Sequence, residues 1–202
     1  LLATGKIAPV DSAAIGYLQQ ASFASHHRQF TLDWFGDLPL FTNVWQVSLG
    51  RVAIILLPRF DLDLYTDEAG LLKRLMEALE ISRHLGARVV SLTGLIPSAT
   101  DYGHAIAKAA AERPDLPAIT TGHATTTAAV TLAVKRILEE SGRDMARERV
   151  GFLGLGSIGA TSLRLMLKHL PHPSKIILCD LYSKLDAIEA IRDEITTQLG
   201  FQ

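Results

Sequence analysis

Apolar residues that recur every three or four positions predict four helices in the first 141 residues. The expected ranges are 11–29, 67–85, 104–112 and 124–141. The supporting apolar positions of the two longer central helices are Leu71, Leu72, Leu75, Met76 and Leu79, and then Val130, Val134, Ile137 and Leu138. In the first range, Ile15, Leu18 and Phe23 share the spacing, and the third range is rich in alanine. Gly86 follows the second range and is a typical helix stop.

Short apolar or alternating runs predict the strands. Residues 44–49 alternate, Gly50 follows, and residues 52–57 form an apolar run, which together indicate a hairpin ending at Pro58. Further short strands are expected at 89–92 and 118–120. Because strands and helices alternate along the chain, the pattern favours an α/β fold with a parallel sheet.

A glycine-rich turn lies between an expected strand and an expected helix near the end of the chain. The apolar run 150–153 leads into Gly154-Leu155-Gly156-Ser157-Ile158-Gly159, and a helical pattern follows. A second apolar run, 175–179, ends at Asp180, 21 residues after Gly159. This order of strand, glycine turn, helix, strand and acid is typical of a dinucleotide-binding βαβ unit. The alternative is an ordinary glycine turn in an α/β protein without a cofactor.

Each glycine of the turn has a mechanical role in the dinucleotide interpretation. Gly154 allows the tight turn, Gly156 lets the backbone approach a pyrophosphate, and Gly159 lets helix and strand pack closely. Ser157 and Ile158 begin the helix, whose N–H groups and positive dipole end would face the phosphates. These five positions are therefore the predicted cofactor-binding loop.

Asp180 completes the predicted cofactor site. Its carboxylate would accept hydrogen bonds from the ribose hydroxyls of the adenosine. The same negative charge would repel a 2′-phosphate, so the sequence favours NAD over NADP, although Lys184 nearby leaves NADP open.

Composition excludes several partners. The 202 residues are 48% hydrophobic and 20% charged, with a net charge of −1, so neither nucleic acid nor an anionic membrane is expected as the main partner. No apolar run is long enough for a membrane span. One cysteine favours a reducing, cytoplasmic setting. His26 and His27 have no further ligand at metal-site spacing, so no metal site is expected.

Two lobes are expected, with a boundary near Gly142. Residues 1–142 would form an α/β substrate lobe that ends in a long linking helix, and residues 143–202 the first part of a dinucleotide-binding domain of Rossmann type. The 53 residues from Val150 to Gln202 suffice for strand, helix, strand and helix. Since a doubly wound sheet has about six strands, the chain is expected to be a fragment. The reacting groups would lie in the cleft between the lobes.

One segment before the glycine turn carries a family resemblance. Residues 120–128, Thr-Thr-Gly-His-Ala-Thr-Thr-Thr-Ala, look like the TTGNTHTA-type segment of long-chain acyl-[acyl-carrier-protein] reductases of cyanobacterial type. Leu57-Pro58 and the strand ending in Thr93-Gly94 also resemble that family's N-terminal lobe, so the likeness covers roughly residues 50 to 200. It implies reduction of a fatty acyl thioester to an aldehyde with a nicotinamide cofactor, with acyl carrier protein as a candidate partner.

Candidate substrate-binding residues lie in the same two stretches, after the strands 89–92 and 118–120. They are Thr93, Gly94, Thr121, Gly122, His123 and Thr125. For Thr93 and Gly94 the alternative is an ordinary turn, and for the threonines it is capping of the following helix. His123 is a candidate general acid or base, because imidazole titrates near neutral pH, and otherwise a polar surface residue.

The chain departs from the family pattern at several positions. His123 and Thr125 stand where the family has Asn and His, and the glycine turn differs from the family's GATGDIG. The family's nucleophilic cysteine belongs to its C-terminal part, which is not in this chain. Cys179 lies on an apolar strand and is expected to be a small core residue.

Two other functions stay open. The order of a long helix and a glycine-loop domain is also similar to dehydrogenases of the shikimate dehydrogenase and malic enzyme type, which act on small polar acids. A domain that binds or senses NAD without catalysis is the third possibility. A homo-oligomer is also open.

Overall fold

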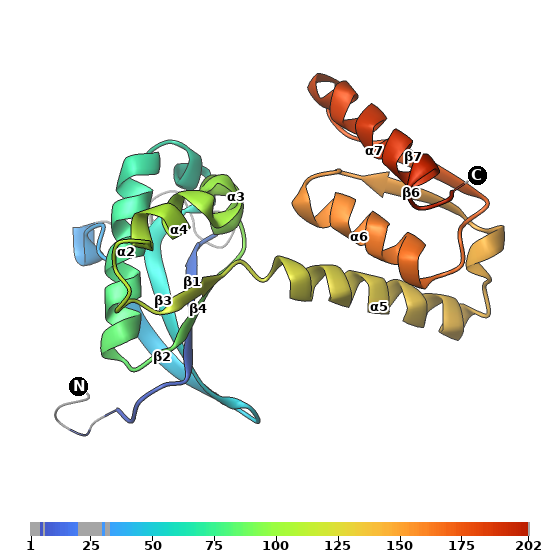
Figure 1. Ribbon diagram of the computed structural model, residues 1–202. Coiled ribbons are helices and arrows are strands. Elements are labelled where there is room, and N and C mark those ends of the chain that lie inside the picture. Colours follow the sequence, from blue (N-terminus) through green and yellow to red (C-terminus); the bar gives the residue numbers. More distant parts are fainter. Residues whose placement is uncertain (1–4, 6, 20–29, 31–32, 202) are drawn as a thin grey trace. The chain divides into compact units, whose positions relative to one another are not determined.

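The chain folds into two compact units, Leu1–Gly122 and His123–Gln202. The computed structural model describes residues 5, 7–19, 30 and 33–201 (Figure 1). The sequence-based boundary near Gly142 assigns helix α5 (His123–Ser141) to the first lobe, whereas the contacts group α5 with the second unit, where it packs on α6 (Ser157–His169).

Within the described residues, the first unit contains a five-stranded, mostly parallel sheet in the order β2-β3-β1-β4-β5. The strands are β1 (Ser12–Leu18), β2 (Leu40–Val47), β3 (Gly50–Phe60), β4 (Val89–Leu92) and β5 (Ala118–Thr120). Only β2 runs antiparallel to its neighbour, β3. The helices are α2 (Glu68–His84), α3 (Ile96–Ala99) and α4 (His104–Ala110). The expected α/β class is therefore confirmed.

The helix expected over residues 11–29 is wrong for the described part of that range, which forms the central strand β1. Ala13 and Ile15 are fully buried and alternate with half-buried neighbours, the period of a strand. β1 pairs in parallel with both β3 and β4. Hydrogen bonding on both edges thus outweighs the helix-like spacing of Ile15 and Leu18. Residues 20–29, with Phe23, His26 and His27, lie outside the described residues.

The hairpin of β2 and β3 forms as expected, but β3 continues through Pro58 to Phe60. Pro58 has no N–H to donate to a neighbouring strand. The ladder with β1 skips it, since Tyr17 pairs with Leu57 and Leu18 with Phe60. A bulge therefore accommodates the proline inside the strand.

The core of the first unit joins α2 to one face of the sheet. Leu71, Leu75 and Leu79 on α2 are fully buried, as the helical spacing predicts, and they pack in one cluster with Ile15 and Ile55 of the sheet. The helix begins at its cap Asp67, whose side chain accepts from Gly70 N–H, and the chain leaves it at Gly86 with φ +89°.

Ion pairs between charged side chains connect the end of β3 to the start of α2. Arg59 is only 8% exposed, and it donates to both carboxylate oxygens of Asp37 at 3.0 and 2.8 Å and to Asp67 Oδ2 at 3.2 Å. Arg74 donates to Asp37 Oδ2 at 2.9 Å. The hydrogen bond from Arg59 lowers the pKa of Asp37 below its usual range, with a further contribution from Arg74.

Replacing Asp37 with asparagine is expected to reduce the free energy of unfolding at neutral pH by about 1 kcal/mol, since the carboxylate is 35% exposed and partly screened. Because the folded pKa is lowered, the wild-type contribution is complete above the usual value of 3.8 and disappears as the pH falls through the lower folded value. Urea unfolding between pH 7 and pH 3 should therefore show a shallower acid dependence in Asp37→Asn. Glu112→Gln, at an exposed position of the same unit, is the control. Parallel acid profiles for wild type and Asp37→Asn would contradict this assignment.

The second unit has the strand and helix order that the glycine turn predicts. β6 (Arg149–Leu153), α6 and β7 (Lys175–Cys179) are followed by α7 (Leu185–Thr197). The two strands are parallel, with Arg149 opposite Lys175 and Leu153 opposite Cys179. On α6, Arg164 donates from Nε to Glu194 of α7 at 2.6 Å.

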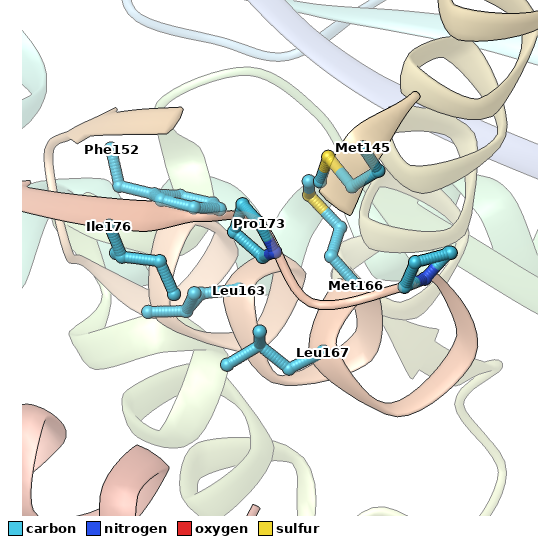
Figure 2. Close-up of a pocket in the computed structure, with 8 residues that line it drawn as sticks. Met145, Phe152, Leu163, Met166, Leu167, Pro173 and Ile176 are labelled. Carbon is cyan, nitrogen blue, oxygen red and sulfur yellow. The ribbon is translucent and has the colours of Figure 1, made fainter. Parts of the chain in front are cut away.

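Apolar side chains from α6, α7 and one face of the two strands form the second core. Its buried members are Ala160, Leu163, Leu167, Ile191 and Ile195. Figure 2 shows the neighbouring group of Met145, Phe152, Leu163, Met166, Leu167, Pro173 and Ile176 around a small hollow. The hollow has no room for a water molecule, so it belongs to the packing of the core and is not a ligand site.

Two expectations for the second unit are wrong, the apolar face of α5 and the burial of Cys179. The last helix, α7, begins at Leu185 after a 3-10 turn, Tyr182–Lys184. On α5, Thr127 and Thr131 are the buried residues, while Val130 and Ile137 of the expected apolar face are 38% and 62% exposed. α5 lies against α6, and the two threonines are its buried residues.

Cys179 is exposed and is not the core residue that the sequence suggests. Ile176 and Leu178 of β7 pack on the second core, so the alternation of the strand turns Cys179 to the opposite face with Ile177. Among the described residues, no helix combines the length and the apolar character that crossing a membrane demands.

Candidate nucleotide-binding loop

The chain reverses direction at Gly154, directly after β6. Gly154 has φ +84°, a left-handed conformation that glycine adopts without strain, and its N–H donates to the carbonyl oxygen of Cys179 at 2.8 Å. The reversal therefore begins at the carboxyl ends of both parallel strands. Ligands of open α/β sheets bind at this edge.

Gly159 brings the first turn of α6 against the reversal. A Cβ placed on Gly159 would overlap the carbonyl oxygen of Gly154 and lie 3.1 Å from its carbonyl carbon. Only glycine fits at this point, so the packing role that the sequence predicts for Gly159 has a steric basis within the unit.

Gly156 differs from the other two glycines. Its φ is −66°, which other residues adopt, and a Cβ placed there would meet no atom within 4 Å in the described part of the chain. Neither backbone strain nor internal packing thus explains a glycine here. A pyrophosphate that approaches the backbone closely would occupy the space that a side chain at Gly156 would fill.

The N-terminus of α6 opens at the loop. Gly156 is its N-cap and has no side chain to cap the helix, and the first turn carries no acidic residue. The N–H of Ala160 makes the first helical bond, to Gly156 O at 2.9 Å. The preceding N–H groups, including those of Ser157 and Ile158, have no partner within the helix and lie at its positive dipole end. A bound anion would accept hydrogen bonds from these N–H groups and would interact favourably with the positive end of the helix dipole.

Asp180 follows β7 and lies against this loop. Its Oδ2 accepts from Leu155 N–H at 2.7 Å, its Oδ1 accepts from Leu181 N–H at 2.7 Å, and Lys184 Nζ is 3.9 Å from Oδ1. The donor Leu155, then Leu181 and Lys184, lower the pKa of Asp180 below its usual range, so the carboxylate is ionised at neutral pH. The structure brings together all six predicted cofactor residues.

The predicted substrate residues of the first unit also gather at one sheet edge. Thr93 and Gly94 follow β4, and Thr121 and Gly122 follow its parallel neighbour β5, where Ser91 pairs with Thr120. His123 and Thr125 lie in the first turn of α5, which belongs to the second unit. The structure groups the first four, and the last two continue the same stretch of chain.

Thr93 and Gly94 have structural contacts of their own. Thr93 donates from N–H and from Oγ1 to Ile15 O at 3.0 and 2.8 Å. Gly94 has φ +58°, and a Cβ there would lie 2.7 Å from the ring and hydroxyl of Tyr17. The Tyr17 hydroxyl accepts from Leu95 N–H at 3.2 Å. These contacts support the alternative of a turn that fixes β4 to β1.

Gly94→Ala is therefore expected to lower the free energy of unfolding by about 1–2 kcal/mol, because alanine is strained at positive φ and its Cβ displaces the Tyr17 ring. Tryptophan fluorescence in urea measures this loss, since Trp34 and Trp45 both belong to the first unit. Ala99→Gly, at the end of the nearby short helix α3, controls for a general effect of changing small residues. An unchanged midpoint for Gly94→Ala would contradict the strain.

Three residues at this edge are not predicted from the sequence: Tyr17, Asp101 and Tyr102. The position of Tyr17 at this edge is not predicted, because the sequence pattern predicts a helix over residues 11–29 where the structure has β1. Asp101 and Tyr102 have φ +49° and +55°, and with Gly103 at +89° they form a left-handed run. Gly103 lies close to Thr121, since a Cβ on Gly103 would be 2.7 Å from Thr121 Cγ2. Such strain in non-glycine residues is uncommon and often accompanies function. Only Gly103 gives any sign of it in the sequence.

Comparison with known proteins does not assign this chain to a family. The chain matches no protein-family model, and a search of curated proteins gave no match. In the described ranges, no three His, Cys, Asp or Glu side chains gather in a way that would hold a metal ion.

Proposed function

We propose that the second unit binds a nicotinamide dinucleotide and that the protein is a nicotinamide-dependent oxidoreductase. The observation that carries the proposal is the loop itself. The helix α6 starts at the carboxyl ends of two parallel strands, and its N-cap, Gly156, has no side chain to cap it. No contact within the described unit explains why this residue is a glycine. A pyrophosphate at this position would receive the N–H groups of Ser157 and Ile158.

NAD(H) is the proposed cofactor in preference to NADP(H). Asp180 is ionised beside the loop, and its charge would repel a 2′-phosphate while its oxygens accept from ribose hydroxyls. Lys184 offsets part of that charge from 3.9 Å, so the preference is expected to be moderate. When bound, the cofactor would supply a hydride.

We propose an acyl thioester as the substrate, reduced to an aldehyde. This part rests on the likeness of residues 120–128 to the acyl-[acyl-carrier-protein] reductases. Thr121, Gly122, His123 and Thr125 would contact the substrate carbonyl or the nicotinamide amide, with His123 as a candidate proton donor. The structural contacts of Thr93 and Gly94 favour a supporting role for that turn.

Calorimetric titration of the 202-residue chain with NADH and with NADPH tests the cofactor. NADH is expected to bind about tenfold more tightly, a difference of about 1.4 kcal/mol. Binding of neither would overturn the proposal. If NADH binds, incubation of the full-length protein with a long-chain acyl thioester and NADH tests the reaction, because the nucleophilic cysteine that the family resemblance implies is not in these 202 residues. Cofactor binding without formation of aldehyde or oxidation of NADH would overturn the reductase assignment alone.

A further inference from the structure

The Asp180 side chain is buried and hydrogen-bonded to the protein's own backbone, which a role in ribose binding alone would not require. Its side chain is 8% exposed, although it follows the last residue of a strand. Both carboxylate oxygens already accept a backbone N–H at 2.7 Å, Oδ2 from Leu155 and Oδ1 from Leu181. Bonds from backbone N–H to an ionised carboxylate are among the stronger hydrogen bonds in proteins.

The bond to Leu155 holds the backbone of the loop between its first two glycines. Gly154 reverses the chain and Gly156 begins the next helix, so Leu155 lies between two glycines. The end of β7 holds this short stretch twice in succession, through Cys179 O to Gly154 N–H and through Asp180 Oδ2 to Leu155 N–H. Without the second bond, nothing else among the described hydrogen bonds ties Leu155 N–H to β7.

We propose that Asp180 is a positioning residue of the phosphate-binding loop, in addition to any contact with the ribose. Its carboxylate holds Leu155 so that Gly156 and the start of α6 keep the arrangement that receives a pyrophosphate. This inference rests on the proposed function. The positioning role and the ribose role predict different results for one kind of ligand. If Asp180 positions the loop, it strengthens the binding even of diphosphates that carry no ribose hydroxyls.

Two probes separate the roles. Calorimetry compares ADP with 2′,3′-dideoxy-ADP, which lacks both ribose hydroxyls, on wild type, Asp180→Ala and Asp180→Asn. Asp186→Asn removes an exposed carboxylate from the first turn of α7 and serves as the matched control. Asp180→Ala is expected to weaken both probes at least about tenfold, whereas Asp186→Asn leaves both unchanged. Asp180→Asn keeps the shape and one acceptor oxygen, so partial rescue is expected, and it replaces the alanine variant if that variant unfolds.

Hydrogen exchange at the Leu155 amide, measured by NMR without ligand, gives a second readout. The amide is expected to be protected in wild type and to exchange faster in Asp180→Ala. Wild-type affinity of Asp180→Ala for dideoxy-ADP, or unchanged protection of Leu155, would overturn the positioning role. Failure of wild type to bind either probe would overturn the proposed function itself, so the two failures are distinguishable.

Discussion

Gly159→Ala is expected to destabilise the second unit by about 3 kcal/mol, the upper part of the range for overpacking. The reason is that the new Cβ would overlap the backbone carbonyl of Gly154, which cannot turn away as a side chain can. Either the reversal at Gly154 or the start of α6 must move. Urea unfolding followed by circular dichroism should show an earlier loss of helix, and dinucleotide binding should disappear with it.

Gly151→Ala is the matched control. Gly151 lies on β6 in the same unit, and a Cβ there would meet no atom within 4 Å among the described residues. Tryptophan fluorescence provides an internal reference, because both tryptophans belong to the first unit. If Gly159→Ala unfolded at the same urea concentration as Gly151→Ala, the close packing of loop and helix would be refuted.

Gly156→Ala is expected to leave the fold nearly intact and to weaken NADH binding about 100-fold, or about 2.7 kcal/mol. The backbone at φ −66° accepts alanine, and the methyl group meets no described atom, so the unfolding free energy should fall by only about 1 kcal/mol through the poorer helix cap. The methyl would instead occupy the space through which a pyrophosphate approaches the loop. Calorimetry on the folded variant measures the loss.

The contrast between the two glycines makes this test specific to a ligand. Gly159→Ala acts through the protein's own packing, whereas Gly156→Ala has no packing partner to disturb. Wild-type affinity for NADH in Gly156→Ala would show that the pyrophosphate does not pass over Gly156. A large loss of stability in the same variant would instead point to an internal role for this glycine.

The glycine loop was predictable because its determinants are local. Residues 150 to 180 contain both strands, the turn and the helix, and the observed elements fall within one or two residues of the expected ones. The alternating burial of Ala53, Ile55 and Leu57 in β3 and the helical spacing of α2 are local in the same sense. The side chains that these segments bury can be predicted from the periodicity of apolar residues in each segment.

The residues whose structure differs from the prediction are those whose conformation or burial depends on residues distant in the chain. β1 became a strand because β3 and β4 hydrogen-bond to both of its edges, which the spacing of Ile15 and Leu18 does not reveal. Tyr17 therefore could not be foreseen as the partner of Gly94. Cys179 is exposed because Ile176 and Leu178 take the side of the core.

The sequence by itself determined that a parallel βαβα unit carries a glycine loop and an acid at the end of its second strand, since each depends on residues close together in the chain. Tertiary structure alone decided what these residues touch. It made Gly159 sterically obligatory, left Gly156 without a packing role, and turned Asp180 toward Leu155 N–H. The physical reason is that steric overlap and hydrogen bonding depend on distances of a few ångströms, and these are set only when two strands and a helix pack together.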